Sequence, residues 1–131
     1  MIERLKLMKP LGYIYYTGDF VAPLGSPGAA HFEKLVEKYL DEKGKKALNR
    51  YSTAAYAAAT VFFQAAELCG KDLTRTCVVD KLTSGHKFDT NGLTGPISFS
   101  PTNHLAADSV QVIEVDPMKG TLTPVTEMKK Y

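Results

Sequence analysis

The sequence lacks a strong excess of charge of either sign. Its 16 Lys and Arg residues are nearly balanced by 14 Asp and Glu residues, which gives a formal net charge of +2. Proteins that bind nucleic acid neutralise phosphates with clustered cations, and a mixed charge pattern provides no such cluster. We therefore expect no nucleic acid partner. We interpret the one basic run as a solvated helix end. It is formed by Lys43, Lys45, Lys46 and Arg50.

A long apolar segment is also absent. The most apolar uncharged stretch, residues 51–66, contains four polar side chains and is shorter than the roughly 20 apolar residues that a membrane helix needs. The first ten residues, MIERLKLMKP, have neither an apolar core nor a small-residue cleavage site, so we expect no secretory signal in this chain. The length and the hydrophobic content of 44% suit one globular domain.

No arrangement typical of an enzyme or a metal site stands out. The three histidines, at positions 31, 86 and 104, have no partner at ligand spacing. There is no nucleophile elbow, no Ser-His-Asp order and no pair of carboxylates. The glycines Gly92 and Gly95 do not match a phosphate-binding loop, and a positive φ at Gly92 and extended backbone before Pro96 account for them better. We predict a protein that is not an enzyme and that uses no metal or cofactor.

The chain has only two cysteines, Cys69 and Cys77, eight residues apart. This spacing does not match a zinc or thioredoxin motif. A disulfide is feasible if Cys69 ends one helix and Cys77 begins the next across a tight turn. The alternative is that the two residues are small buried hydrophobes.

The N-terminal part predicts a strand followed by a surface helix. The segment LGYIYY, residues 11–16, is rich in aromatic and β-branched residues and predicts a buried strand that ends in a loop at residues 17–19. Ser26 and Pro27 suit the cap and first turn of a helix. One apolar stripe follows, and Gly44 is placed to end this helix. The stripe is formed by Phe32, Leu35, Val36, Tyr39 and Leu40.

Two further helices are predicted in the middle of the chain. Residues 50–68 are apolar on nearly every side, which predicts a helix buried on more than one face and closed by Gly70. Thr74 suits the cap of the next helix, whose inner face would carry Val78, Val79 and Leu82.

The last third of the chain predicts a β-meander. An Asn91-Gly92 turn signal is followed by strand patterns at residues 97–99, 110–115 and 121–125. The resulting order, a strand, three helices and a meander, is unusual for a complete domain, because one strand cannot form the sheet that several helices cover. We expect the N-terminal strand to need partners that this chain lacks.

Five segments follow one another in an order and spacing that point to a family. They read GYIYYTGDFVAP, FEKLVEKY, YSTAAYAAATVFFQAAELCGKDLTRTCVVDKL, GLTGPISFSPTNH and VQVIEV. Together, over residues 11–125, they resemble the C-terminal third of the type I extracytoplasmic solute-binding proteins, the branched-chain amino acid-binding family of ABC transporters.

The resemblance implies an α/β fold, part of a periplasmic-binding-protein-like type I clamshell whose two lobes close on a small ligand. Residues 1–84 would be the returning part of lobe one, a strand and three helices. Residues 85–94 would be the loop leading to a crossover, and residues 95–131 the C-terminal strands of lobe two. The unusual order of elements would follow from this division between two lobes.

The resemblance also implies two ligand-binding residues. Tyr51 matches a position where the family places an aromatic residue against the ligand, and Tyr16 would lie near the cleft. The spacing alone fits two interpretations of such tyrosines: a ligand contact at the end of a helix, or a core aromatic with its hydroxyl hydrogen-bonded. The family's main clamps on the ligand lie upstream of the matched segments.

The function implied is that of a fragment of an ABC-transporter solute-binding protein, periplasmic or extracytoplasmic, which captures amino acids or similar small polar solutes by clamshell closure. Its partners would be the solute and the permease subunits. A fragment would also expose apolar surfaces that favour self-association. The alternatives are a ligand-sensing domain of a receptor or regulator with the same fold, and a stand-alone interaction domain.

Overall fold

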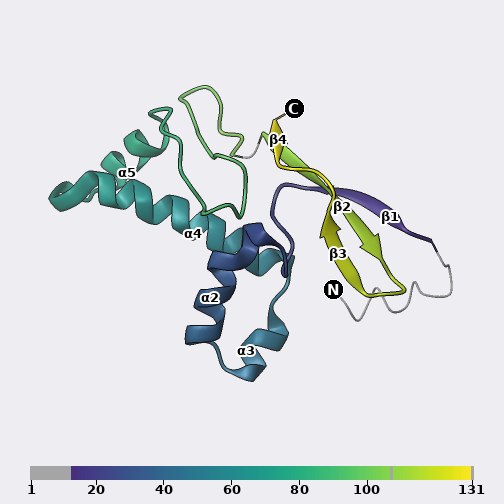
Figure 1. The fold of residues 1–131 in the computed structure, drawn as a ribbon. Coiled ribbons are helices and arrows are strands. Elements are labelled where there is room, and N and C mark those ends of the chain that lie inside the picture. Colours follow the sequence, from purple (N-terminus) through teal and green to yellow (C-terminus); the bar gives the residue numbers. More distant parts are fainter. Residues whose placement is uncertain (1–12, 107, 131) are drawn as a thin grey trace.

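The computed structural model describes residues 13–106 and 108–130, which form a group of helices beside an antiparallel sheet (Figure 1). This mixed architecture is consistent with the expected partial α/β fold. No helix in the described ranges is long and apolar enough to cross a membrane. The elements are β1 (Tyr15–Asp19), the short 3-10 helix η2 (Pro27–Ala29), α2 (Ala30–Tyr39), α3 (Glu42–Ala47), α4 (Arg50–Cys69), η3 (Gly70–Asp72), α5 (Arg75–Leu82), β2 (Ser109–Asp116), β3 (Thr121–Pro124) and β4 (Lys129–Lys130).

The sheet joins the two ends of the chain. Strand β2 lies between β1 and β3, all antiparallel, and β4 pairs with the start of β2. In this register Thr17 lies opposite Ile113 and Tyr16 opposite Glu114. The expectation that the N-terminal strand lacks a partner in this chain was therefore wrong. Its partner is about a hundred residues away in the sequence, where local patterns carry no information about pairing.

Strand β1 is displaced and more exposed than predicted. It begins at Tyr15 and includes Thr17 to Asp19, which were expected to form a loop. The side chains of Tyr13 and Tyr16 are 68% and 62% exposed, so the strand is not buried. The helices lie to one side of the sheet in Figure 1, and the central residues of β1, Tyr16 to Gly18, are exposed. Residues 11 and 12 of the predicted strand lie outside the described residues.

Helix α4 has the predicted extent but not the predicted burial. Its N-cap Asn49 accepts a hydrogen bond from the backbone N–H of Tyr51, and Gly70, with φ 57°, follows its last residue. Exposed fractions of 51% and 62% for Phe62 and Phe63 show that the outer face is open, which contradicts burial on more than one face. Its buried residues form one stripe, Thr53, Ala57, Val61, Ala65 and Cys69, at intervals of four residues. Beside this stripe, the partly buried Tyr56 packs against Phe32 of α2.

The first predicted helix is divided in two. Helix α2 ends at Tyr39, and the carboxylate of Asp41 accepts the backbone N–H of Gly44 at 2.7 Å to cap α3. Gly44 thus lies inside a helix instead of ending one, because a capping carboxylate restarts the helix three residues earlier. The predicted cap Ser26 makes no capping bond, since its hydroxyl donates to the carbonyl of Pro23. Phe32 and Val36 are buried, while Tyr39 and Leu40 are exposed.

Helix α5 begins as predicted. The Thr74 hydroxyl accepts the backbone N–H of Cys77 at 3.2 Å. Val78 is buried against α4, but Val79 is 48% exposed and does not belong to the inner face. A disulfide joins Cys69 to Cys77, with their Cα atoms 6.0 Å apart, and links the end of α4 to the first turn of α5.

The segment after α5 folds back along α4 as a long loop (Figure 1). The predicted turn is present, because Asn91 and Gly92 both have positive φ, at 56° and 85°. The predicted strand at residues 97–99 is reduced to one isolated bridge between Ile97 and Phe88. Both of these side chains are nevertheless buried in the core beneath α4, so the apolar pattern at 97–99 reports burial and not strand pairing.

Candidate functional site

A cleft of about 1000 Å³ lies between the sheet and the junction of α3 and α4. One wall is formed by strands β1 to β3, with Thr17, Ile113 and Thr121 among its residues. The loop after β1 and the residues that precede α4 form the other wall. This volume lies at the upper end of the range for small-molecule sites. The polar and charged side chains that line it are Thr17, Asp19, Lys45, Lys46, Asn49, Arg50, Thr53, Thr121 and Thr123.

An ion pair connects the two walls of this cleft. The guanidinium of Arg50, at the start of α4, donates from Nε to Oδ2 of Asp19 at 2.6 Å and from Nη2 to Oδ1 at 3.0 Å. Asp19 is the last residue of β1, and its Oδ1 also accepts the backbone N–H of Val21. The hydrogen bond to Asp19 raises the pKa of Arg50. Bidentate pairing of this kind fixes direction as well as distance, so it sets the end of β1 against the start of α4.

Two lysines add positive charge to the same side of the cleft. Lys45 donates to Glu37 at 2.7 Å and to Glu42 at 3.2 Å, and these carboxylates raise its pKa. Lys46 is exposed and makes no ion pair within the described residues. The basic run is therefore not simply a solvated corner, because three of its four members line the cleft.

The structure does not bring the two predicted tyrosines together in the cleft. Tyr16 lies opposite Glu114 in the register, and its hydroxyl donates to the Glu114 carboxylate at 3.1 Å. This hydrogen bond raises the pKa of Tyr16. The neighbours of Glu114, Ile113 and Val115, line the cleft, so alternation along the strand places the Tyr16 and Glu114 side chains on the opposite face. Tyr51 is 75% exposed in the first turn of α4, beside Arg50.

No group of three or more His, Cys, Asp or Glu residues in the described part of the chain is arranged to hold a metal ion. What the cleft offers is a set of hydroxyls, an amide, cations and backbone groups around a space of small-molecule size. Such a set can bind and orient a polar solute by hydrogen bonds and charge. It contains no nucleophile activated by a neighbouring base.

Comparison with known families identifies the fold to which this cleft belongs. A family model described as periplasmic binding protein matches residues 1–121. The chain belongs to this family. The family resemblance seen in the sequence is thereby confirmed. No curated protein and no solved structure matches the chain.

Membership of the periplasmic binding protein family supports a general solute-binding role for this chain, since its members bind small molecules and are generally not enzymes. Full-length members of the family act outside the cytoplasm.

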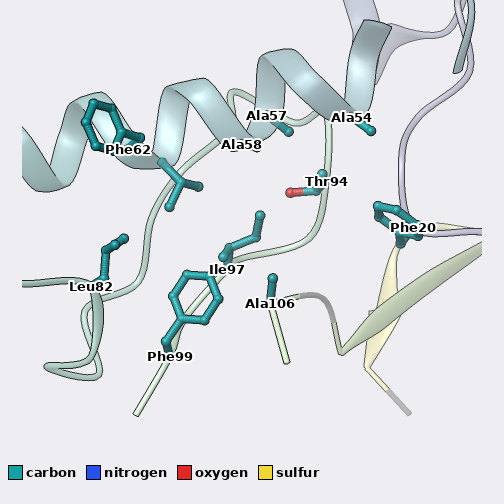
Figure 2. Close-up of a pocket in the computed structure, with 11 residues that line it drawn as sticks. Phe20, Ala54, Ala57, Ala58, Phe62, Leu82, Thr94, Ile97, Phe99 and Ala106 are labelled. Carbon is teal, nitrogen blue, oxygen red and sulfur yellow. The ribbon is translucent and has the colours of Figure 1, made fainter. Parts of the chain in front are cut away.

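A second cavity of about 290 Å³ lies under α4 and is almost wholly apolar. Figure 2 shows Ile97 and Phe99 from the long loop below Ala57 and Ala58 of α4. The polar side chain in its lining, Thr94, has its hydroxyl engaged with Thr90 and with the carbonyl of Gly95. In this periplasmic binding protein a polar solute is therefore better matched to the cleft than to the apolar cavity.

Sequence reasoning missed the ion pair on which the cleft depends. The local pattern predicts a loop at Asp19 and a surface position for Arg50. The available signal was a cluster of cations immediately before a helix whose first residues also carry Tyr51. That signal gives no indication of a partner 31 residues upstream.

Proposed function

We propose that this chain is part of an extracytoplasmic solute-binding protein of an ABC transporter, which captures amino acids or similar small polar solutes and passes them to permease subunits. The observation that carries the proposal is the family match over residues 1–121, which coincides with a polar cleft of small-molecule size. Capture would involve closure of the cleft around the solute, in the manner of a clamshell.

We also propose a division of the chain between two lobes. Residues 1–84 would belong to lobe one and residues 95–131 to lobe two, with residues 85–94 leading to a crossover. The β1–β2 pairing would then place a strand of each part in one sheet, and the cleft lies against this sheet.

The disulfide supports an extracytoplasmic location. Structural disulfides persist in oxidising compartments and are rare in the cytosol. The bond between Cys69 and Cys77 ties α4 to α5 at the edge of the core, away from the cleft. A role in holding the fold together outside the cytoplasm suits this position.

Tyr51 and Tyr16 are the ligand contacts that we propose from the family resemblance. Tyr51 stands at the start of α4 next to Arg50, which lines the cleft. Tyr16 would reach a solute only from the other face of the sheet. We expect Tyr51→Ala to weaken solute binding more than Tyr16→Ala does.

Binding to this chain alone should be weak, because an open cleft cannot exclude water from the solute. The test is a titration of the 131-residue chain, followed by the amide NMR signals of the cleft residues, with leucine, succinate, acetamide and putrescine as separate probes. Dissociation constants of about 1 mM or weaker correspond to about 4 kcal/mol of binding free energy or less. A monomer that binds leucine far below that concentration would contradict the fragment interpretation, and a chain that binds none of the four probes would contradict solute binding.

We also propose that the chain associates with itself. Large apolar side chains of α4 are exposed, among them Phe62, Phe63 and Leu68. Exposed apolar surface of this kind favours association. Sedimentation velocity over a range of concentrations should show a weight-average mass that rises with concentration, and Phe63→Ser should reduce the rise.

A further inference from the structure

We infer that the cleft selects anionic solutes, with carboxylates as the ligand class and with Arg50 and Lys46 as the groups that receive the negative charge. This inference rests on the proposed function, since it requires that the cleft holds a solute. It concerns the charge of the ligand, which neither the family match nor the fold specifies.

The charged lining of the cleft is unequal in sign. Lys45, Lys46 and Arg50 contribute positive charge, and Asp19 is the single acid among the described lining residues. The other polar lining groups are neutral hydroxyls and an amide. The lining therefore carries an excess of positive charge, and such an excess raises the local concentration of oppositely charged solutes.

Arg50 retains hydrogen-bonding capacity although it is paired. A guanidinium carries five N–H donors in a planar fork, and the two bonds to Asp19 use one from Nε and one from Nη2. The remaining three donors are fixed in direction by the pairing. A group held in this way loses little freedom when it binds a carboxylate, which is why Arg suits planar anions.

Asp19 is poorly placed to hold an ammonium group on the solute. Its two oxygens already accept three N–H donors, two from Arg50 and one from the backbone of Val21. Recruiting it for a solute cation would break a bidentate pair whose acid side chain is only 15% exposed. This wall therefore has no acid ready to recognise a positively charged solute.

Lys46 differs from its neighbour Lys45 in whether its ammonium group is already paired with a carboxylate. Lys45 is held between two glutamates, whereas Lys46 is exposed and has no ion-pair partner among the described residues. Both lysines lie near the end of α3, and both line the cleft. Lys46 is the residue whose charge is free to meet a carboxylate.

The experiment compares the four probes on the intact 131-residue chain and then repeats the succinate titration on Lys46→Gln and Lys43→Gln. Both substitutions remove one positive charge from α3, but Lys43 does not line the cleft, so it controls for net charge. We expect succinate to bind more tightly than acetamide, leucine or putrescine. We expect Lys46→Gln to weaken succinate binding by about threefold, the size typical of an exposed charge pair, and Lys43→Gln to leave it nearly unchanged.

The outcomes separate this inference from the proposed function. If leucine, acetamide or putrescine shifts the cleft signals and succinate does not, the cleft binds solutes and the inference about charge is wrong. Equal effects of Lys46→Gln and Lys43→Gln would also overturn it, because the attraction would then be one of net charge alone. If none of the four probes binds, the proposed function fails and this inference fails with it.

Discussion

Replacing Gly28 with alanine should destabilise the fold through a steric conflict with the long loop. A Cβ atom at position 28 would lie 2.6 Å from the carbonyl oxygen of Gly92 and 2.8 Å from the Cβ of Ala22. Ordinary contacts of this type are about 3.5 Å or longer. Neither neighbour can rotate away, because one atom belongs to the backbone and the other is fixed to it. The loop must therefore move.

The movement would disturb a buried connection between two parts of the chain. The backbone N–H of Ala22 donates to the carbonyl of Leu93 at 2.8 Å, and both residues are almost completely buried. Overpacking of this kind costs about 1–3 kcal/mol. Alanine also lowers the conformational entropy of the unfolded chain, which stabilises the folded state by about 0.4–1 kcal/mol. The net expectation is a loss of about 1–2 kcal/mol in the free energy of unfolding.

Urea denaturation measures this loss, and Gly18→Ala provides the control. With a slope of about 1–3 kcal/mol per M, the midpoint of Gly28→Ala should fall by roughly 0.5–1 M. No atom lies within 4 Å of a Cβ placed on Gly18, and its φ is not positive, so the same substitution there meets open space. Equal midpoints for the two variants would refute the close approach of η2 to the Asn91-Gly92 turn.

Three further expectations follow from the described contacts. Replacing both Cys69 and Cys77 with serine should lower the free energy of unfolding by about 2.5 kcal/mol, which is the loop-closure entropy for a separation of eight residues. Urea denaturation of this variant and of the oxidised wild type measures the difference. A double-mutant cycle on Asp19→Asn and Arg50→Gln should give a coupling of about 1 kcal/mol, since the Arg50 side chain is 35% exposed, and a coupling of zero would contradict the bidentate pair. The pKa of Asp116 is lowered by a hydrogen bond from the backbone N–H of Lys119 and by further bonds from the Lys119 side chain and the backbone of Met118. The charged Asp116 carboxylate therefore stabilises the fold above about pH 4, and this stabilisation is lost as the pH falls through the lower pKa of the folded state. Asp116→Asn should therefore lower the urea midpoint more at pH 7 than at about pH 3.

The helices show which features local sequence predicts well. The extent of α4, its closure by Gly70 and the Thr74 cap of α5 were all predicted, because propensity and capping depend on residues a few positions apart. The sequence does not predict the division of α2 from α3, because Gly44 signals a helix end while Asp41 signals a helix start. The Asp41 carboxylate accepts the Gly44 N–H, and α3 therefore begins before Gly44.

The exposure of side chains was predicted less well. Phe62 and Val79 carry apolar patterns that predict burial, yet both are about half exposed. Burial depends on which element lies across from a face, and that element is specified by the rest of the fold. The pattern at Ile97 illustrates the same point, since it predicted burial correctly but strand pairing wrongly.

By itself the sequence determined the family, the extent of α4 and the start of α5, because these follow from motifs and from contacts between near neighbours. Only the tertiary structure decided that β1 pairs with β2, that Arg50 meets Asp19, and that Tyr16 faces away from the cleft. Each of these facts depends on residues that are 31 or more positions apart. The free energy of such contacts is gained only after the loops between them close, so no local pattern records it.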